Sequence, residues 1–441
     1  MRNAKAWLFT VAMATAALAQ VPDASACGGC FIAQSENTVV TGHRMILSIS
    51  QQQTTLYDQF GYSGDPSSFA WILPVKGIAD IGLSSDALFE TLEQETTVTI
   101  SSPNINCNNG CANGFSDSAG SGGAGGAGGG GGVTVVAQST VGPYETVQLK
   151  STDPGALNDW LAQHNYAIPA DVVPVISAYV AEGFDFLALK LVPGKGVSAM
   201  RPVRVSTPGA SPVLPLRMVA AGTGAITPIT LWIMGEGRYA PSNMPSFQIQ
   251  QSQLFWNWNT QSSNYALTKQ LAFASTGNKG WLIEAGEPYS KWYLQDSLDY
   301  LAAYEPENSG YGGDGADPEQ EVAEDLEALF GYIPDTSLWV TRLHGELSRV
   351  ALAADLQLAA SPDQTQVQRY FELSTTVGTP PACPPSPCDD FSGGFGPWGG
   401  LSGGGSSASG CAMTSGGSVP MLGGVALMAA LAFARRRRAR R

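Results

Sequence analysis

Two short apolar segments, one near each end of the chain, delimit the part that can fold as a globular domain. The first, residues 6–18, follows the basic residues Arg2 and Lys5 and precedes an Ala-Ser-Ala sequence at residues 24–26. A charged start, an apolar stretch of this length and a small-residue cleavage site are typical of a secretory signal peptide. We therefore predict that signal peptidase removes residues 1–26 and leaves Cys27 at the new N-terminus.

The second apolar segment, residues 419–434, is followed by a block of six arginines and preceded by small polar residues after Cys411. A helix of sixteen residues reaches about 24 Å, against roughly 30 Å for a hydrocarbon core, and long arginine side chains can close that gap. The arginines should stay on the cytoplasmic side, which places everything upstream outside. Residues 379–410, rich first in Pro and then in Gly and Ser, have the composition of a tether.

This C-terminal pattern of Gly410-Cys411, apolar run and arginine block resembles the MYXO-CTERM sorting signal of myxobacteria. The resemblance covers residues 411–441. It implies that a C-terminal sorting protease cuts near Cys411, which then carries a lipid anchor at the cell surface or outer membrane. The alternative is an uncut transmembrane helix, which would hold the protein in the inner membrane with its domain outside.

The charge of the chain excludes one class of partner. There are 37 Asp and Glu residues against 23 Lys and Arg, a formal net charge of −14, and removal of both ends would take away eight basic residues but only Asp23 among the acids. A protein that binds nucleic acid through a basic face has the opposite balance. We therefore expect no nucleic-acid partner.

The cysteines agree with export. Apart from Cys411 there are six, in three pairs that are each close in sequence, and an even number in an oxidising compartment favours disulfides. These disulfide candidates are Cys27, Cys30, Cys107, Cys111, Cys383 and Cys388. Local pairing is one of several connectivities, and a four-thiolate zinc site or a redox pair at residues 27–30 are the competing interpretations.

Strand and helix patterns alternate along residues 27–378 and predict one α+β domain, built on a mainly antiparallel sheet with a few packed helices. Met45, Leu47 and Ile49 alternate with other residues, as in a strand. Residues 112–132 form a Gly-rich insertion loop between strand-like runs. Proline inside the strand-like runs 202–206, 213–219 and 227–234 favours edge or irregular strands.

Helices are expected at residues 84–95, after Asp153, at residues 170–182 and after Asp317. Pro318 fits the first position of the last helix, and Gln320 would complete a capping box with Asp317.

Several pieces of this region, in order, resemble the uncharacterised bacterial domain family DUF 2330. They are Cys27-Gly-Gly-Cys30-Phe31, Phe69-Ala-Trp71-Ile-Leu-Pro74-Val75, Val213-Leu-Pro215-Leu216-Arg217 and Trp339-Val-Thr341-Arg342-Leu343. The resemblance spans roughly residues 27–360. It implies an exported domain with a Cys-bearing mature N-terminus, and no assigned activity comes with it.

Motifs that would identify an enzyme are missing from the sequence. It has no G-x-S-x-G, H-E-x-x-H or phosphate-loop sequence, and His43, His164 and His344 lie far apart. We expect no cofactor and no firm metal site. Asp314 and Asp317, after a Gly-rich turn, are weak calcium candidates, although a solvated turn with acids at a helix start explains them better.

The sequence Phe-Trp-Asn-Trp-Asn at residues 255–259 is the most suggestive local feature. In a strand, Trp256 and Trp258 would share one face and could stack on a ligand, whereas the competing interpretation is a pair facing the core beside Tyr265 and Phe273.

Together these features favour an exported, surface- or membrane-anchored protein with a non-enzymatic binding role or a structural role in the envelope. The alternative is a secreted or anchored hydrolase whose catalytic residues are dispersed along the chain. A concave pocket in which acids, or Ser and His, converge would favour the hydrolase.

Overall fold

The computed structural model describes residues 30–32, 39–63, 69–105, 138–150, 153–163, 172–195, 199–220 and 225–382. These belong to one compact unit, Met1–Cys383. The signal peptide, the Gly-rich insertion at residues 112–132, residues 383–410 of the tether and the sorting signal lie outside the described residues. So do Cys27, Cys107, Cys111, Cys383, Cys388 and Cys411.

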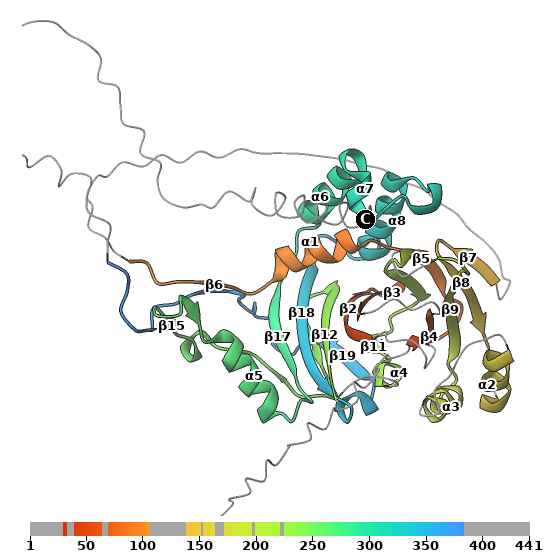
Figure 1. The fold of residues 1–441 in the computed structure, drawn as a ribbon, viewed down its shortest axis with the longest axis horizontal. Coiled ribbons are helices and arrows are strands. Elements are labelled where there is room, and N and C mark those ends of the chain that lie inside the picture. The colour runs from red at the N-terminus through yellow and green to blue at the C-terminus, as the bar shows by residue number, and fades with distance from the viewer. Residues whose placement is uncertain are drawn as a thin grey trace, which may run out of the picture. The chain divides into compact units, whose positions relative to one another are not determined.

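Two β-sheets form the centre of the domain (Figure 1). The larger has eight strands, in the order β14 (Ser246–Phe247), β17 (Trp281–Pro288), β18 (Leu338–Ser348), β12 (Ile226–Glu236), β2 (Val39–Ile49), β3 (Gln53–Ser63), β10 (Val203–Pro208) and β5 (Asp80–Leu83). The smaller has five, in the order β1 (Cys30–Ile32), β4 (Phe69–Val75), β9 (Asp185–Leu191), β8 (Tyr144–Leu149) and β7 (Gln138–Val141).

The remaining strands form small peripheral sheets. They are β11 (Val213–Leu214), β19 (Leu356–Ala360) and β13 (Tyr239–Pro241), then β16 (Ser262–Ser263), β15 (Trp256–Asn257) and β21 (Thr376–Val377), and finally β20 (Tyr370–Glu372) with β6 (Thr99–Ser101). Most neighbouring strands are antiparallel, and β2 with β12 is the main parallel pair. The α+β class predicted from the sequence is confirmed.

The alternation along the central strands decides how the layers stack. Met45 and Leu47 of β2 join Trp71 and Leu73 of β4 in a core cluster between the two sheets. Ile46, on the opposite face of β2, packs in a second cluster under helices. Successive strand residues point to opposite faces, so each sheet is covered on both sides, and the order of layers is helix, sheet, sheet, helix.

The helices divide between the two outer layers and the periphery. Over the eight-stranded sheet lie α1 (Asp86–Thr96), α6 (Lys291–Tyr304) and α8 (Pro318–Phe330), with α7 (Pro306–Ser309) beside them. Over the five-stranded sheet lie α2 (Pro154–Gln163), α3 (Val173–Ala181) and α4 (Leu216–Ala220). The helix α5 (Tyr265–Ser275) packs with a peripheral cluster. No helix among the described residues is long and apolar enough to cross a membrane, and residues 419–434 are not among them.

Two strand predictions are wrong in detail. Residues 213–219 were expected to be one strand, but only Val213–Leu214 pair, and α4 follows Pro215. The helical turn places Leu216 and Met218 in different core clusters, whereas in a strand the two side chains would share one face.

The run 227–234 was expected to be an edge or irregular strand because of Pro228, yet β12 lies between β18 and β2 and pairs with β18 in regular register. Proline is tolerated there because β2 pairs with β12 only from Ile229 onward.

The N-cap predicted at Asp317 is confirmed, and Ser85 has the same role at the start of α1. Ser85 accepts a hydrogen bond from the Ala87 N–H and begins α1, and Asp317 accepts one from the Glu319 N–H and begins α8. The predicted capping box is wrong, because the Gln320 side chain donates to Glu324 instead of turning back to Asp317.

Candidate functional site

A cleft of about 440 Å³ opens where two neighbouring strands separate. β10 pairs with β3 only as far as Val203 opposite Asp58, whereas β3 continues to Ser63 alongside β2. The space left by β10 is bounded by β2, β3, β12, the start of α1 and residues 200–202. Gly42 and Gly61, paired across β2 and β3, add no side chains, which keeps the cleft open.

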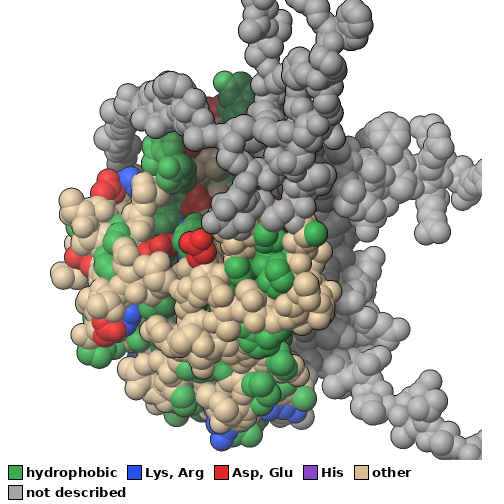
Figure 2. Space-filling view, turned by 90° about the vertical axis from the view of Figure 1, so that its left-hand side faces the viewer, with side chains coloured by type: hydrophobic (Ala, Val, Ile, Leu, Met, Phe, Trp, Pro, Cys, Tyr) green, Lys and Arg blue, Asp and Glu red, His purple; other side chains and the backbone are tan. Residues whose placement is uncertain are grey.

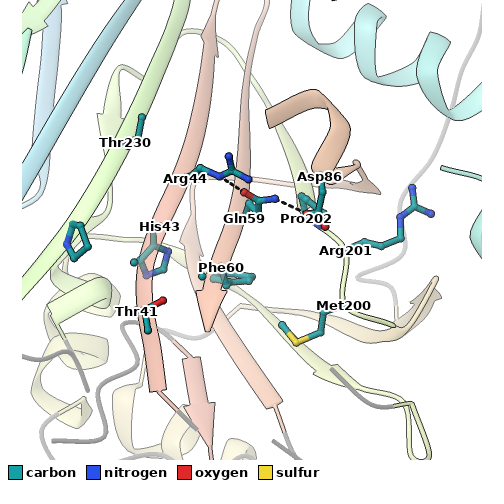
Figure 3. Close-up of a pocket in the computed structure, with 13 residues that line it drawn as sticks. Thr41, His43, Arg44, Gln59, Phe60, Asp86, Met200, Arg201, Pro202 and Thr230 are labelled. Atoms are coloured by element: carbon teal, nitrogen blue, oxygen red, sulfur yellow. Dashed lines mark hydrogen bonds between the residues drawn. The ribbon is translucent and has the colours of Figure 1, made fainter. Parts of the chain in front are cut away.

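A chain of hydrogen bonds crosses the wall of this cleft (Figure 3). The Nε–H of Arg44 on β2 donates to the side-chain oxygen of Gln59 on β3 at 2.5 Å, and the amide nitrogen of Gln59 donates to Asp86. Asp86 is held in place because Ser85 caps the first turn of α1. Asp86 therefore orients Gln59, and Gln59 orients the Arg44 guanidinium through its Nε–H.

The guanidinium of Arg44 is half-buried, and its central carbon lies 5.8 Å from the centre of the Phe89 ring. Within the described part of the chain, no carboxylate lies at ion-pair distance from it. Its Nε–H is used by Gln59, which leaves the donors of the two terminal nitrogens for another group. A half-buried arginine with oriented, unused donors is suited to binding an anion in two-point fashion.

Arg201, on the opposite side of the cleft, differs from Arg44 because its donors are used within the protein. Its terminal nitrogens donate to Glu321 at 2.9 and 3.1 Å, and its Nε–H donates to the carbonyl of Ser84 at 3.1 Å. The cleft therefore receives its uncompensated positive charge from Arg44.

His43, one of the residues that line the cleft, forms a buried pair with Asp58. Nδ1 of His43 lies 3.1 Å from Oδ1 of Asp58, and burial raises the pKa of Asp58, an effect that His43 partly offsets. The imidazole packs edge-on against Phe60, and its Nε2 has no hydrogen-bond partner. The His43 side chain has no solvent-exposed surface, so this nitrogen is closed off from a ligand in the cleft.

Of the other two histidines, His344 is the one among the described residues, and it contacts Thr230 of the cleft wall. His344 lies 3.0 Å from Glu346 and 3.4 Å from Thr230, while His164 is outside the described residues. No Ser or Cys is found among the described residues that line the cleft, and Asp86 is the one carboxylate there.

The two tryptophans singled out in the sequence lie away from the cleft, at and beside β15. Both are half-buried, and their rings meet edge to face at 6.2 Å. Trp256 packs against the peripheral cluster that contains Phe273 and borders Tyr265. The side of the molecule on which β15 lies shows hydrophobic side chains scattered over its surface (Figure 2). The proposed ligand platform at Trp256 and Trp258 stays a prediction.

The remaining candidate residues are placed as follows. Asp317 is the cap of α8, and Asp314 lies in the short 3-10 turn Gly313–Gly315 before it. Within the described ranges, no three His, Cys, Asp or Glu residues cluster in a way that could hold a metal. The backbone of Cys30 pairs with Trp71 in β1 and β4.

Arg44 was missed when the sequence was read, although a signal was present. It stands inside a strand whose neighbours on both faces are apolar, His43 apart. A charge within a strand covered on both sides must find either a partner or a ligand. The same signal marks Asp58, Arg204, Glu284 and Arg342. Asp58 has His43 as its partner, and the other three have charged partners in the structure.

Comparison with known proteins gives one match. A model of a family described as an uncharacterized protein conserved in bacteria, DUF2330, matches residues 21–350. No curated protein and no solved structure matches the chain.

Proposed function

The chain belongs to the DUF2330 family of uncharacterised proteins conserved in bacteria, and from this starting point we propose that it is an exported, anchored protein that binds a small anionic molecule in the cleft beside Arg44. The ligand would carry a carboxylate or a phosphate group. The proposal rests on one observation: the half-buried guanidinium of Arg44 has no carboxylate partner among the residues that the structure describes.

The geometry of the cleft supports anion binding in two ways. Gln59 and Asp86 orient the guanidinium before a ligand arrives, which lowers the entropic cost of binding. The volume of about 440 Å³ lies in the range of small-molecule sites.

Binding is favoured over hydrolysis because the described residues that line the cleft include no Ser, no Cys and no pair of acids. Asp86 is the one carboxylate, and the imidazole of His43 is closed off beside Asp58. A hydrolase of the serine or glycosidase type needs a nucleophile with an accessible base, or two facing carboxylates.

Export and anchoring are supported by the sequence alone. Residues 1–26 have the pattern of a signal peptide, and Cys411 precedes a short apolar segment and an arginine block. The three cysteine pairs suit an oxidising compartment.

Calorimetric titration of the purified protein with inorganic phosphate and with succinate tests the binding proposal and separates the two ligand chemistries. We expect saturable binding of at least one anion, and a loss of about 10- to 100-fold in affinity in Arg44→Gln, since charged hydrogen bonds contribute about 1.5–3 kcal/mol. Arg349→Gln is the matched control, because Arg349 is exposed and does not line the cleft. Equal affinities in wild type and Arg44→Gln would rule out the site.

Mass spectrometry of the protein isolated from cell fractions tests export and anchoring. The mature chain should begin near Cys27, end at a modified Cys411 and occur in the membrane fraction, whereas Cys411→Ala should leave that fraction or keep its tail. An intact first and last peptide on a protein found in the cytoplasm would contradict the proposal.

A further inference from the structure

A second cavity, of about 380 Å³, enters the space between the two sheets at one end. Its walls come from both sheets: Leu47, Leu56 and Val205 from the eight-stranded sheet, and Leu73 and Val75 from the five-stranded sheet. All five belong to the core cluster between the sheets. The apolar core is therefore reachable from the surface at this end of the sandwich.

The loop after β10 forms one side of the mouth, and its polar backbone groups are used inside the protein. Thr54 Oγ1 donates to the Gly209 carbonyl at 2.8 Å and accepts from the Ser211 N–H at 2.8 Å. Pro208 and Ala210 are left to line the entrance. This side of the mouth therefore offers apolar contacts.

The acidic residue at the mouth is hydrogen-bonded by its neighbours. Asp355 accepts hydrogen bonds from the Tyr179 hydroxyl at 2.5 Å and from the Arg217 guanidinium at 2.7 Å. The Arg217 guanidinium also pairs with Glu182. One guanidinium against two carboxylates leaves this cluster with a net negative charge, so the attraction for an anionic head group depends on Lys76.

Lys76 supplies the remaining charge. It follows β4 directly, is exposed, lines the cavity and places its Nζ 4.6 Å from the centre of the Phe184 ring. Among the described residues, no carboxylate lies within ion-pair distance of it. The inner walls of the cavity are therefore apolar, and its entrance carries the cationic side chain of Lys76.

We propose that this cavity binds a single-chain anionic amphiphile of the fatty-acid class, with the alkyl chain between the sheets and the carboxylate at Lys76. The proposal is independent of the cleft beside Arg44, because the two cavities share no lining residue. An apolar chain gains affinity from each methylene removed from water, and the cation fixes the end at which the chain enters.

Titration of the purified full chain with hexanoate, octanoate, decanoate and decanol, each below its micelle concentration, tests this proposal. Affinity should rise by about fourfold for each added methylene while the cavity still has room. Decanoate should bind tighter than decanol, and Lys76→Gln should remove that preference, by about fivefold or less, without changing the affinity for decanol.

A bulky residue at the entrance provides the steric test. Ala210→Trp should weaken decanoate binding at least tenfold, because Ala210 is exposed and lines the mouth. Ala303→Trp, an exposed alanine of α6 that does not line the cavity, is the matched control and should bind as wild type does.

Three results would overturn the proposal: no binding of any chain, affinity that does not change with chain length, or unchanged binding in Ala210→Trp. Equal affinities for decanoate and decanol in wild type would refute the anionic head group. None of these results bears on phosphate or succinate binding at Arg44.

Discussion

Two arginines on the helix-covered face of the eight-stranded sheet are in opposite situations. Arg204 of β10 is buried and donates to Asp325 of α8 at 2.8 Å, and Asp325 also accepts from Ser84 and Tyr311. Arg44 of β2 is half-buried, and its only hydrogen-bond partner among the described residues is neutral Gln59. The charge of Arg204 is therefore compensated by Asp325. The guanidinium of Arg44 keeps N–H donors that no described residue uses.

This difference separates a structural charge from a binding charge. The Arg204–Asp325 pair joins α8 to the sheet, and Asp325 also accepts hydrogen bonds from two neighbouring hydroxyl groups. Removing one member of such a pair leaves a buried charge alone, which is costly. Arg44 can lose its charge at little cost to the fold, because no buried acid depends on it.

The largest effect is expected for Asp325→Ala. It leaves Arg204 buried without its main partner and should lower the free energy of unfolding at neutral pH by about 3–5 kcal/mol. Urea denaturation measures this. Glu324→Ala is the matched control, because Glu324 is half-exposed and lies 3.4 Å from Arg204, so its loss should cost about 1 kcal/mol or less. If Asp325→Ala and Glu324→Ala lowered the free energy of unfolding equally, Asp325 would not be the main partner of Arg204.

The second-largest expected effect is the change of the free energy of unfolding with pH. Burial raises the pKa of Asp325 from 3.8 to about 6, while Arg204 and hydrogen bonds oppose that shift. Because the folded state holds this proton more tightly than the unfolded state, the contribution of Asp325 to stability should increase as the pH falls from about 7 to 4. The total gain should be about 2–3 kcal/mol.

Asp325→Asn removes this titration. The difference in unfolding free energy between wild type and Asp325→Asn should therefore grow in favour of wild type toward pH 4. A difference that stays constant between pH 7 and 4 would contradict the shifted pKa.

A smaller effect is expected for Gln59→Leu, which leaves Arg44 in place without its orienting acceptor. Affinity for the anion in the cleft should fall about fivefold, in line with about 1 kcal/mol for one hydrogen bond. The same titration calorimetry measures it, with Gln320→Leu as an exposed control outside the cleft. A loss as large as that in Arg44→Gln would mean that Gln59 itself contacts the ligand.

Local patterns predicted much of the secondary structure. The alternation of Met45, Leu47 and Ile49 placed β2 correctly, and Asp317 with Pro318 located the start of α8. These signals depend on residues close in sequence, which is why they could be read without the fold.

The strand pairing and the cleft could not be read in this way. The parallel pairing of β12 with β2 joins residues almost two hundred positions apart, and nothing local specifies it. The cleft exists because β10 separates from β3 beyond Val203, which is a property of the assembled sheet. The sequence alone does not distinguish Arg44 from Arg204, because each is a basic residue inside a strand. The fold shows that Arg204 is the one with an acid, Asp325, beside it.

Chemical denaturation of wild type and Arg44→Gln, each with and without the anion that binds more tightly, tests the role of Arg44 most directly. Without ligand, the two free energies of unfolding should agree within about 1 kcal/mol. At a ligand concentration of 100 times the wild-type Kd, wild type should gain about 2.7 kcal/mol and Arg44→Gln at most about 1.4 kcal/mol. Equal gains in the two proteins, or a loss of stability in ligand-free Arg44→Gln as large as that in Asp325→Ala, would contradict the assignment of Arg44 as the binding residue.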